Sequence, residues 1–288
     1  MKNISKDKYK FIHALRPFSF AVALVACGAG VSLAWVEGWH NPTSILLVFV
    51  GGMLLQAGVN LINDYSDLSE KNRLQSTQVD AIQRNFRIGL VCFCIAIGIG
   101  FWFVYQVGFT FFILCLAGLL GALGYTLKPV NYKSRGLGVV LVFWLMGVFM
   151  VLGSYLAISG QWNTNVIWLS IPVSLLVSLL LLSNELRDYE ADKQANIQTL
   201  VVRLGYQKGS LIYKALVAAA GLSVMLLAWW FNQPWLLLGL LAFILLPGLV
   251  GLLRADASAR GALTSGSGRM LMVFGILYNL SLLFGFSS

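Results

Sequence analysis

Residues 166–192 read VIWLSIPVSLLVSLLLLSNELRDYEAD. The first eighteen of these residues carry no charged side chain, whereas the last nine hold four carboxylates. An apolar run of about 18 residues or more is long enough to cross the hydrocarbon core of a bilayer as a helix. The stretch therefore predicts a membrane-spanning helix that ends in an acidic cluster.

Similar apolar runs recur along the 288 residues, of which 58% are hydrophobic and only 11% charged, with a mean hydropathy of +0.80. A soluble domain carries about 25% charged residues. This composition excludes an ordinary cytosolic enzyme, a disordered protein and a nucleic-acid-binding module, despite a net charge of +9. We expect an all-α polytopic membrane protein with nine transmembrane helices, at Phe18–Trp35, Ser44–Ile62, Ile88–Tyr105, Gly108–Leu127, Leu137–Ile158, Val166–Ser183, Leu211–Trp230, Pro234–Leu253 and Met270–Phe286.

The basic residues predict how the chain is oriented. All 20 lysines and arginines fall in the N-terminal tail and in the loops after spans 2, 4, 6 and 8, when Lys214 at the start of span 7 is counted with the loop before it. Cytoplasmic loops are enriched in lysine and arginine. We therefore expect a multi-pass protein of the bacterial inner membrane, with its N-terminus and these four loops in the cytoplasm.

Two acidic clusters follow spans 2 and 6. Each places one amide and two carboxylates along a single helical face if the helix continues through the cluster. Carboxylates at the end of a membrane helix indicate a functional site. The residues are Asn60, Asp64 and Asp67 in the first cluster, and Asn184, Asp188 and Asp192 in the second.

The two clusters also share the pattern Asn-x-x-x-Asp-Tyr, and Asn60 lies 124 residues before Asn184. An internal duplication explains this spacing, with spans 1–4 and 5–8 as repeats and span 9 added. Membrane proteins built from repeats commonly place their sites between them. The two clusters are therefore expected to act together.

Carboxylate and amide oxygens suit Mg²⁺, which completes its coordination with water and phosphate oxygens. A diphosphate is the obvious bridging ligand, and nearby basic side chains could pair with its remaining oxygens. Apolar helices above such a site suggest that the diphosphate carries a polyprenyl tail. The residues alone thus predict metal-dependent chemistry on a lipid diphosphate, with Arg73, Lys128, Arg135 and Lys193 as the basic candidates.

Residues 60–67 (NLINDYSD) and 184–193 (NELRDYEADK) resemble the two aspartate-rich motifs of the UbiA superfamily of intramembrane prenyltransferases. Within it, the chain looks most like the 1,4-dihydroxy-2-naphthoate polyprenyltransferases of menaquinone synthesis, on Tyr125-Thr126 and residues 132–138 (YKSRGLG) and 199–205 (TLVVRLG). The resemblance covers nearly the whole chain. It implies one transmembrane prenyltransferase domain over residues 1–288, folded as a UbiA-type bundle.

The resemblance also implies roles for individual residues. Catalysis and the binding of two Mg²⁺ ions would fall to Asp64, Asp67, Asp188 and Asp192, supported by Asn60 and Asn184. The diphosphate would be held by Arg73, Lys128, Lys193 and Arg135. The allylic cation would be stabilised by the π faces of Tyr65, Tyr125 and Tyr189. The implied substrates are a polyprenyl diphosphate and an aromatic acceptor, and a naphthoate acceptor would lose its carboxylate during transfer.

Two departures from the naphthoate enzymes keep other acceptors open. Leu68–Gln83 contains neither glycine nor proline, and Val139 stands where those enzymes usually carry an acidic residue. The alternatives are transfer to 4-hydroxybenzoate or homogentisate, or a lipid-modifying or cyclising activity. From another class, an ion-coupled secondary transporter also combines repeats with carboxylates, although here the acids lie at one membrane face. Membrane lipid is the expected surroundings, and the sequence indicates no nucleic acid and no particular protein partner.

Overall fold

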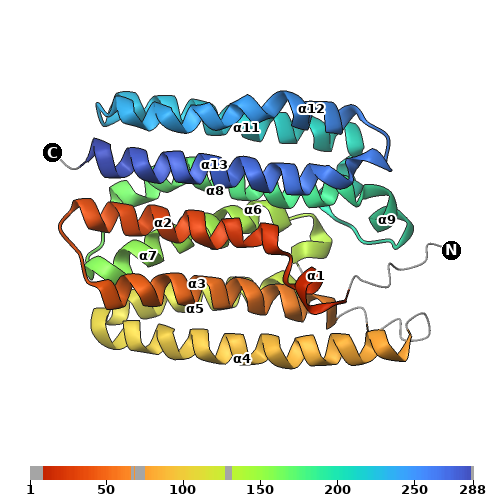
Figure 1. Cartoon of the computed structure of the whole chain (residues 1–288), viewed down its shortest axis with the longest axis horizontal. Coiled ribbons are helices and arrows are strands. Elements are labelled where there is room, and N and C mark those ends of the chain that lie inside the picture. The colour runs from red at the N-terminus through yellow and green to blue at the C-terminus, as the bar shows by residue number, and fades with distance from the viewer. Residues whose placement is uncertain (1–8, 66–67, 69–74, 127–131, 287–288) are drawn as a thin grey trace.

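A computed structural model describes the whole chain except residues 1–8, 66–67, 69–74, 127–131 and 287–288. Within the described residues every regular element is helical, and there is no β-strand. The long helices lie side by side as a bundle (Figure 1). The prediction of an all-α membrane protein is therefore confirmed.

The first half of the chain forms a short N-terminal turn and four long helices. Asn41 caps the second long helix through hydrogen bonds from the backbone N–H groups of Thr43 and Ser44, and Pro42 occupies its first position. Gly108, at φ 91°, separates the third helix from the fourth. The elements are α1 (Phe11–Leu15), η1 (Pro17–Ser19), α2 (Phe20–Val36), α3 (Pro42–Asn63), α4 (Ser76–Val107) and α5 (Phe109–Thr126).

The second half repeats long helices but interrupts them with shorter pieces. Of these pieces, α9 carries the last residue of the second acidic cluster and α10 follows it. The elements are η3 (Tyr132–Arg135), α6 (Gly138–Val142), η4 (Phe143–Val148), α7 (Phe149–Ser159), α8 (Thr164–Arg187), α9 (Tyr189–Gln194), α10 (Leu200–Leu204), α11 (Tyr206–Trp230), η5 (Pro234–Leu245), α12 (Leu246–Arg254), η6 (Ala259–Gly261) and α13 (Ala262–Gly285).

The rod formed by α6, η4 and α7 is not a regular α-helix, because η4 is a π-helical segment. Gly147 in this segment packs so closely on α8 that an added Cβ would lie 2.4 Å from the Ser174 Oγ atom. One turn further along α8, the Ser178 hydroxyl donates to the Val139 carbonyl at 3.0 Å. Small and hydroxyl-bearing residues thus let these two rods approach closely, as is common between membrane helices.

The helices at the centre of the bundle are α2 and α8, and α4 lies at its edge (Figure 1). In its apolar stretch 72% of α8 is buried, against 17% of α4. The outer helix therefore presents an apolar surface that suits contact with lipid rather than water. The ends of α3 and α8 lie at one end of the bundle, and the end of α13 lies at the other.

Eight helices among the described residues are long and apolar enough to span a membrane. The remaining predicted span corresponds to α5, whose apolar stretch Phe109–Ala122 is shorter. A multi-pass membrane protein is therefore confirmed, while the number nine stays a prediction.

The two largest errors in the predicted helix boundaries are at helix starts. The third helix begins at Ser76 rather than Ile88, and the last begins at Ala262 rather than Met270. The first turns of both helices contain polar residues, and a search for apolar runs therefore places their starts too late. Gln75 and Gln78 form a capping box at the first, and Ser267 at the second is buried with a 2.8 Å hydrogen bond to the Tyr213 hydroxyl.

Candidate active site

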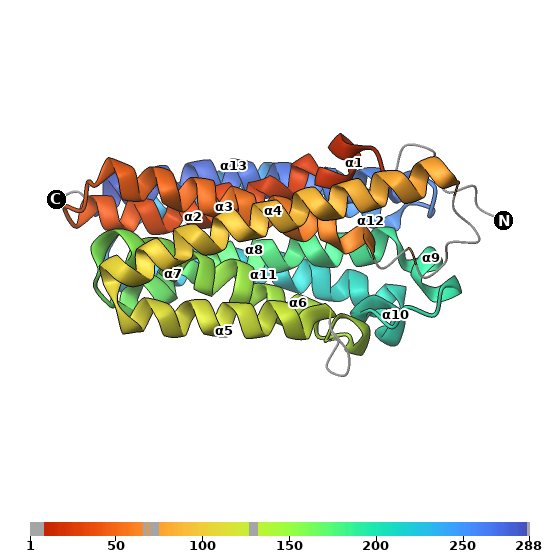
Figure 2. The same ribbon diagram turned by 90° about the horizontal axis from the view of Figure 1, so that it is seen from below.

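The described residues of the two acidic clusters lie at the same end of the bundle, as their common spacing predicts (Figures 1 and 2). Asp64 is the C-terminal cap of α3. Asp188 occupies the corresponding position at the end of α8 and leads directly into α9. Helix ends thus bring Asp64 and Asp188 to one end of the molecule.

In the first cluster, Asp64 forms an ion pair with an arginine of the same chain. The Asp64 side chain is only 5% exposed, and its Oδ1 atom accepts a 2.7 Å hydrogen bond from Arg16 Nη2. Arg16 stands between α1 and η1 in the left-handed conformation, at φ 51°. The Asn63 side-chain oxygen, with its amide oriented to satisfy its hydrogen bonds, accepts from Arg16 Nη1 at 2.9 Å. This carboxylate is therefore built to face positive charge.

The Asn60 side chain joins α3 to the N-terminal turn. Its Nδ2 atom donates to the Leu15 carbonyl and to the Ser19 hydroxyl, each at 2.7 Å. Gln56, one turn earlier on α3, donates to Ser19 at 3.1 Å and to Asn60 Oδ1 at 3.4 Å. Asn60 is thus fully engaged in holding the segment that carries Arg16.

The second cluster spans the junction between α8 and α9. The Asp188 backbone N–H donates to the Asn184 carbonyl at 2.9 Å, and the Asp192 N–H donates to the Asp188 carbonyl at 2.8 Å. These successive bonds set the three residues one turn apart, as the sequence spacing predicts. The Asp188 carboxylate is 44% exposed and receives two hydrogen bonds from its neighbour Arg187, at 2.9 and 2.6 Å.

Asn184 differs from Asn60 in one respect that bears on ligand binding. Its Oδ1 atom is buried and accepts no hydrogen bond from any described residue. A buried oxygen without a partner is costly, and such an atom needs an explanation. An amide oxygen among carboxylates is a suitable ligand for Mg²⁺, so the residues present fit a divalent cation.

The described aspartates are not gathered around one point. Among the residues that the structure describes, no three Asp, Glu, His or Cys side chains form a metal-sized group. Asp64 is engaged by Arg16, and Asp188 by Arg187. The convergence of both clusters on a pair of cations stays a prediction.

Two of the predicted tyrosines have aromatic neighbours. The Tyr65 ring is half-exposed and stacks on Phe86, with centroids 4.1 Å apart. The Tyr189 ring lies 5.8 Å from the ring of Tyr206, and the Lys193 ammonium lies 5.9 Å from the Tyr189 centroid. Tyr189 and Lys193 are thus close together beside the second cluster, whereas Tyr65 belongs to the first.

The remaining predicted residues are placed only in part. Arg135 lies on η3 and is exposed. Asp67, Arg73 and Lys128 lie outside the described residues, and so does the side chain of Tyr125, whose backbone belongs to the last turn of α5. Their predicted roles stay predictions.

Sequence reasoning missed two arginines of this region. It used Arg16 and Arg260 only as indicators of orientation, yet Arg16 pairs with Asp64 and Arg260 Nη1 pairs with Glu190 Oε1 at 2.8 Å. The partners are 48 and 70 residues apart in the chain. No local spacing could have revealed either pair, because only the folded bundle brings these residues together.

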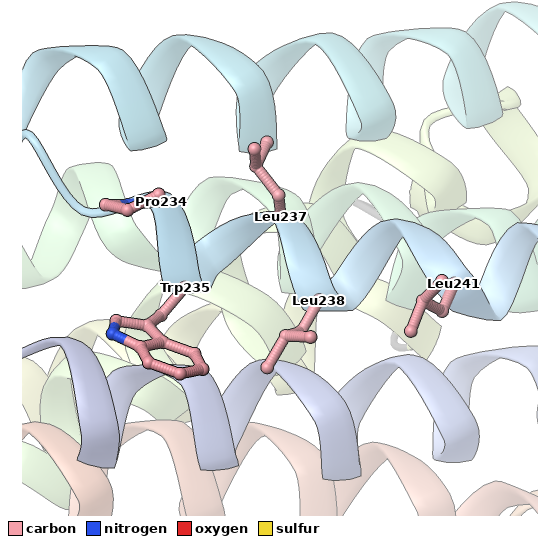
Figure 3. A pocket seen from close by; sticks show the side chains of 5 residues that line it. All are labelled: Pro234, Trp235, Leu237, Leu238 and Leu241. Atoms are coloured by element: carbon pink, nitrogen blue, oxygen red, sulfur yellow. The ribbon is translucent and has the colours of Figure 1, made fainter.

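A pocket of about 380 Å³ lies far from the acidic clusters. Figure 3 shows its lining along the first turns of η5, from Pro234 to Leu241. Trp235 in this lining contacts Phe284 near the end of α13. The pocket therefore belongs to the opposite end of the bundle, and we assign it no part in the site.

Comparison with known proteins identifies the family of this chain. The model of the UbiA prenyltransferase family matches residues 22–275. The chain belongs to this family. It is 30% identical over 249 residues to a 1,4-dihydroxy-2-naphthoate octaprenyltransferase of Haemophilus influenzae, covering 79% of this chain and 80% of that protein. It is 32% identical over 214 residues to the enzyme of the same name from Escherichia coli, covering 68% of each.

The fold of this UbiA protein is also found among solved structures. A UbiA homologue from Archaeoglobus fulgidus, bound to GPP and Mg²⁺, superposes with a TM-score of 0.65. The match covers 96% of this chain and 98% of that one, at 15% sequence identity. The predicted UbiA-type architecture is therefore confirmed, and the chain is a membrane-bound prenyltransferase.

Proposed function

We propose that this UbiA protein transfers a polyprenyl group from an allylic diphosphate to 1,4-dihydroxy-2-naphthoate in a Mg²⁺-dependent reaction of menaquinone synthesis. The observation that carries the proposal is the pair of oxygen-rich helix ends at one end of the bundle, at Asp64 and Asp188. Two curated relatives named as naphthoate octaprenyltransferases support this acceptor.

The residues present define how the diphosphate end of the substrate would be held. Asp64, Asp188, Asp192 and the unpaired oxygen of Asn184 would bind the metal ions, two in our proposal. Bound Mg²⁺ supplies charge neutralisation to the departing diphosphate, and the metal-bound homologue supports this cofactor. Lys193 adds a positive charge beside the second cluster for the phosphate oxygens.

The second part of the proposed reaction is the transfer of the prenyl group to the acceptor ring. The bond between the allylic carbon and the diphosphate oxygen breaks, and a bond forms to the ring carbon that bears the carboxylate. That carbon then loses its carboxylate as CO₂. The packed apolar helices exclude water from the allylic cation, and the faces of Tyr65 and Tyr189 offer it electron density.

We further infer that the whole chain is one prenyltransferase domain of the bacterial inner membrane, with the site on the cytoplasmic side. The positive-inside rule supports this orientation, because all 20 lysines and arginines are predicted to lie on the side of the acidic clusters. Membership in a prenyltransferase family sets aside the transporter interpretation.

The test is a product assay by mass spectrometry. Purified protein in lipid nanodiscs is incubated with Mg²⁺, one allylic diphosphate, and dihydroxynaphthoate, 4-hydroxybenzoate or homogentisate in parallel. We expect a prenylated, decarboxylated naphthoate product that disappears with EDTA and in the Asp188→Asn variant. A product from another acceptor only would overturn the naphthoate assignment. Metal-independent turnover would overturn the role of the acidic clusters.

A further inference from the structure

The helix α9 carries Asp192 and yet buries none of its six side chains. It follows Asp188 directly, so its direction sets where Asp192 lies relative to the rest of the second cluster. A helix this short is not stable by itself in water, and the apolar packing of this one is limited to the partly buried Tyr189 in its first turn. The position of the rest of α9, including Asp192, therefore depends on polar contacts.

Arg260 supplies such contacts. Its Nη1 atom pairs with Glu190 Oε1 on α9 at 2.8 Å, and its Nε atom donates to the Ala255 carbonyl at 3.0 Å. The guanidinium carbon lies 3.9 Å from the centre of the Tyr206 ring. The Arg260 side chain is only 11% exposed. One planar group thus contacts α9, the start of α11 and the loop after α12.

The surface under the guanidinium is itself anchored. The Tyr206 hydroxyl donates to the Leu253 carbonyl at 2.9 Å, and the Tyr206 ring contacts the ring of Tyr189 in the first turn of α9. Exposed ion pairs add little by themselves. A planar arginine fork that is also stacked on an aromatic face is more rigid and is not replaced by lysine.

We propose that Arg260 is a positioning residue for the second aspartate cluster. Through Glu190 it fixes α9, and α9 holds Asp192 one turn beyond Asp188. This inference rests on the proposed function only in assigning those two carboxylates to the metal site. Residues that orient metal ligands typically change metal affinity or activity by about 10- to 100-fold when they are replaced.

The first measurement needs neither metal nor substrate. Hydrogen–deuterium exchange of the metal-free protein is compared for the wild type, Arg260→Gln, Glu190→Gln and Arg254→Gln. Arg254 is an exposed arginine of the same region and serves as the matched control. We expect faster amide exchange over residues 189–197 in the first two variants and no change in the control. Unchanged exchange in Glu190→Gln, which leaves the stacked arginine in place, would overturn the proposal even if Arg260→Gln did not fold.

The second measurement reads the metal site. Mn²⁺ binding in the presence of inorganic diphosphate is followed by EPR, and prenyl transfer is titrated with Mg²⁺. We expect both Arg260→Gln and Glu190→Gln to need about tenfold more metal, with most of kcat restored at saturating Mg²⁺. Arg260→Lys should recover only part of the loss. Faster exchange with unchanged metal affinity would overturn the positioning role, whereas an inactive wild type would refute the proposed function and leave the exchange result standing.

Discussion

The two aspartate clusters share a sequence pattern but not an environment. Asp64 is nearly buried and pairs with an arginine from a distant segment, whereas Asp188 is 44% exposed and pairs with its own neighbour. Asn60 is fully hydrogen-bonded, while the Asn184 Oδ1 atom is buried without a partner among the described residues. The helix position is repeated, but the surrounding contacts are not.

This difference suggests a division of work between the clusters. At the first, an incoming cation has to replace Arg16 at the carboxylate. At the second, it gains an oxygen that has no competing hydrogen bond. Repeated sequence therefore does not imply repeated energetics, because the groups around each repeat come from different elements.

The largest effect should follow from removing either carboxylate. Asp64→Asn and Asp188→Asn should each lower prenyl transfer by about 100-fold or more, since metal ions supply several kcal/mol of charge stabilisation. Turnover per folded protein is measured by product mass spectrometry. Normal turnover in one of the two variants would show that the clusters do not act together.

Replacing the side-chain amide of each cluster, Asn60 or Asn184, should lower the unfolding free energy by different amounts. Asn60→Ala removes hydrogen bonds to Leu15, Ser19 and Gln56 and should lower the unfolding free energy by about 2 kcal/mol. Asn184→Ala removes no such bond at Oδ1 and should change it by less than about 1 kcal/mol. Unfolding in SDS, followed by tryptophan fluorescence, provides the measurement. Equal losses of unfolding free energy in the two variants would contradict the difference between the clusters.

Replacing Arg16 should make the first cluster more like the second. In Arg16→Gln the metal no longer competes with a guanidinium for Asp64. We expect Mn²⁺ binding without diphosphate to tighten by about fivefold, the equivalent of a partly exposed ion pair of about 1 kcal/mol. Titration calorimetry tests this, and weaker or unchanged binding would contradict the competition.

Arg187 provides the smallest effect and the matched control. Its pair with Asp188 is partly exposed on both sides, and ion pairs near the surface contribute little. Arg187→Gln should change the unfolding free energy by no more than about 0.5 kcal/mol. The same SDS titration checks it, and a loss as large as that of Asn60→Ala would show that the second cluster is also held rigidly.

The fold could be predicted from sequence because apolar runs of sufficient length leave few alternatives in a bilayer. Helix starts could not be placed where polar residues are helical. Ser267 looked like part of a loop, but Tyr213 on a neighbouring helix satisfies its hydroxyl. Such partners lie far away in the chain, so they do not appear in the local pattern of apolar and polar residues.

The site could be predicted to a similar depth. The backbone hydrogen bonds of Asp188 and Asp192 follow the spacing of the cluster, but α8 ends at Arg187 and Asp188 separates it from α9, so the cluster does not lie on one uninterrupted helix. The involvement of Arg16 and Arg260 escaped prediction, because a basic residue in a cytoplasmic loop already has a sufficient reason to be there. Only the contacts of the folded protein distinguish an arginine that is explained by membrane orientation alone from an arginine that also pairs with a carboxylate.

The π-helical segment between α6 and α7 has a consequence for helix registry. In a regular α-helix, residues eight positions apart such as Val139 and Gly147 would point about 80° away from each other. Yet both meet α8, at Ser178 and Ser174. The wider turn takes up this angular offset. A one-residue deletion within Phe143–Met146 should therefore restore α-helical winding and keep both contacts with α8, because Val139 and Gly147 would then lie seven positions apart and within about 20° of the same direction.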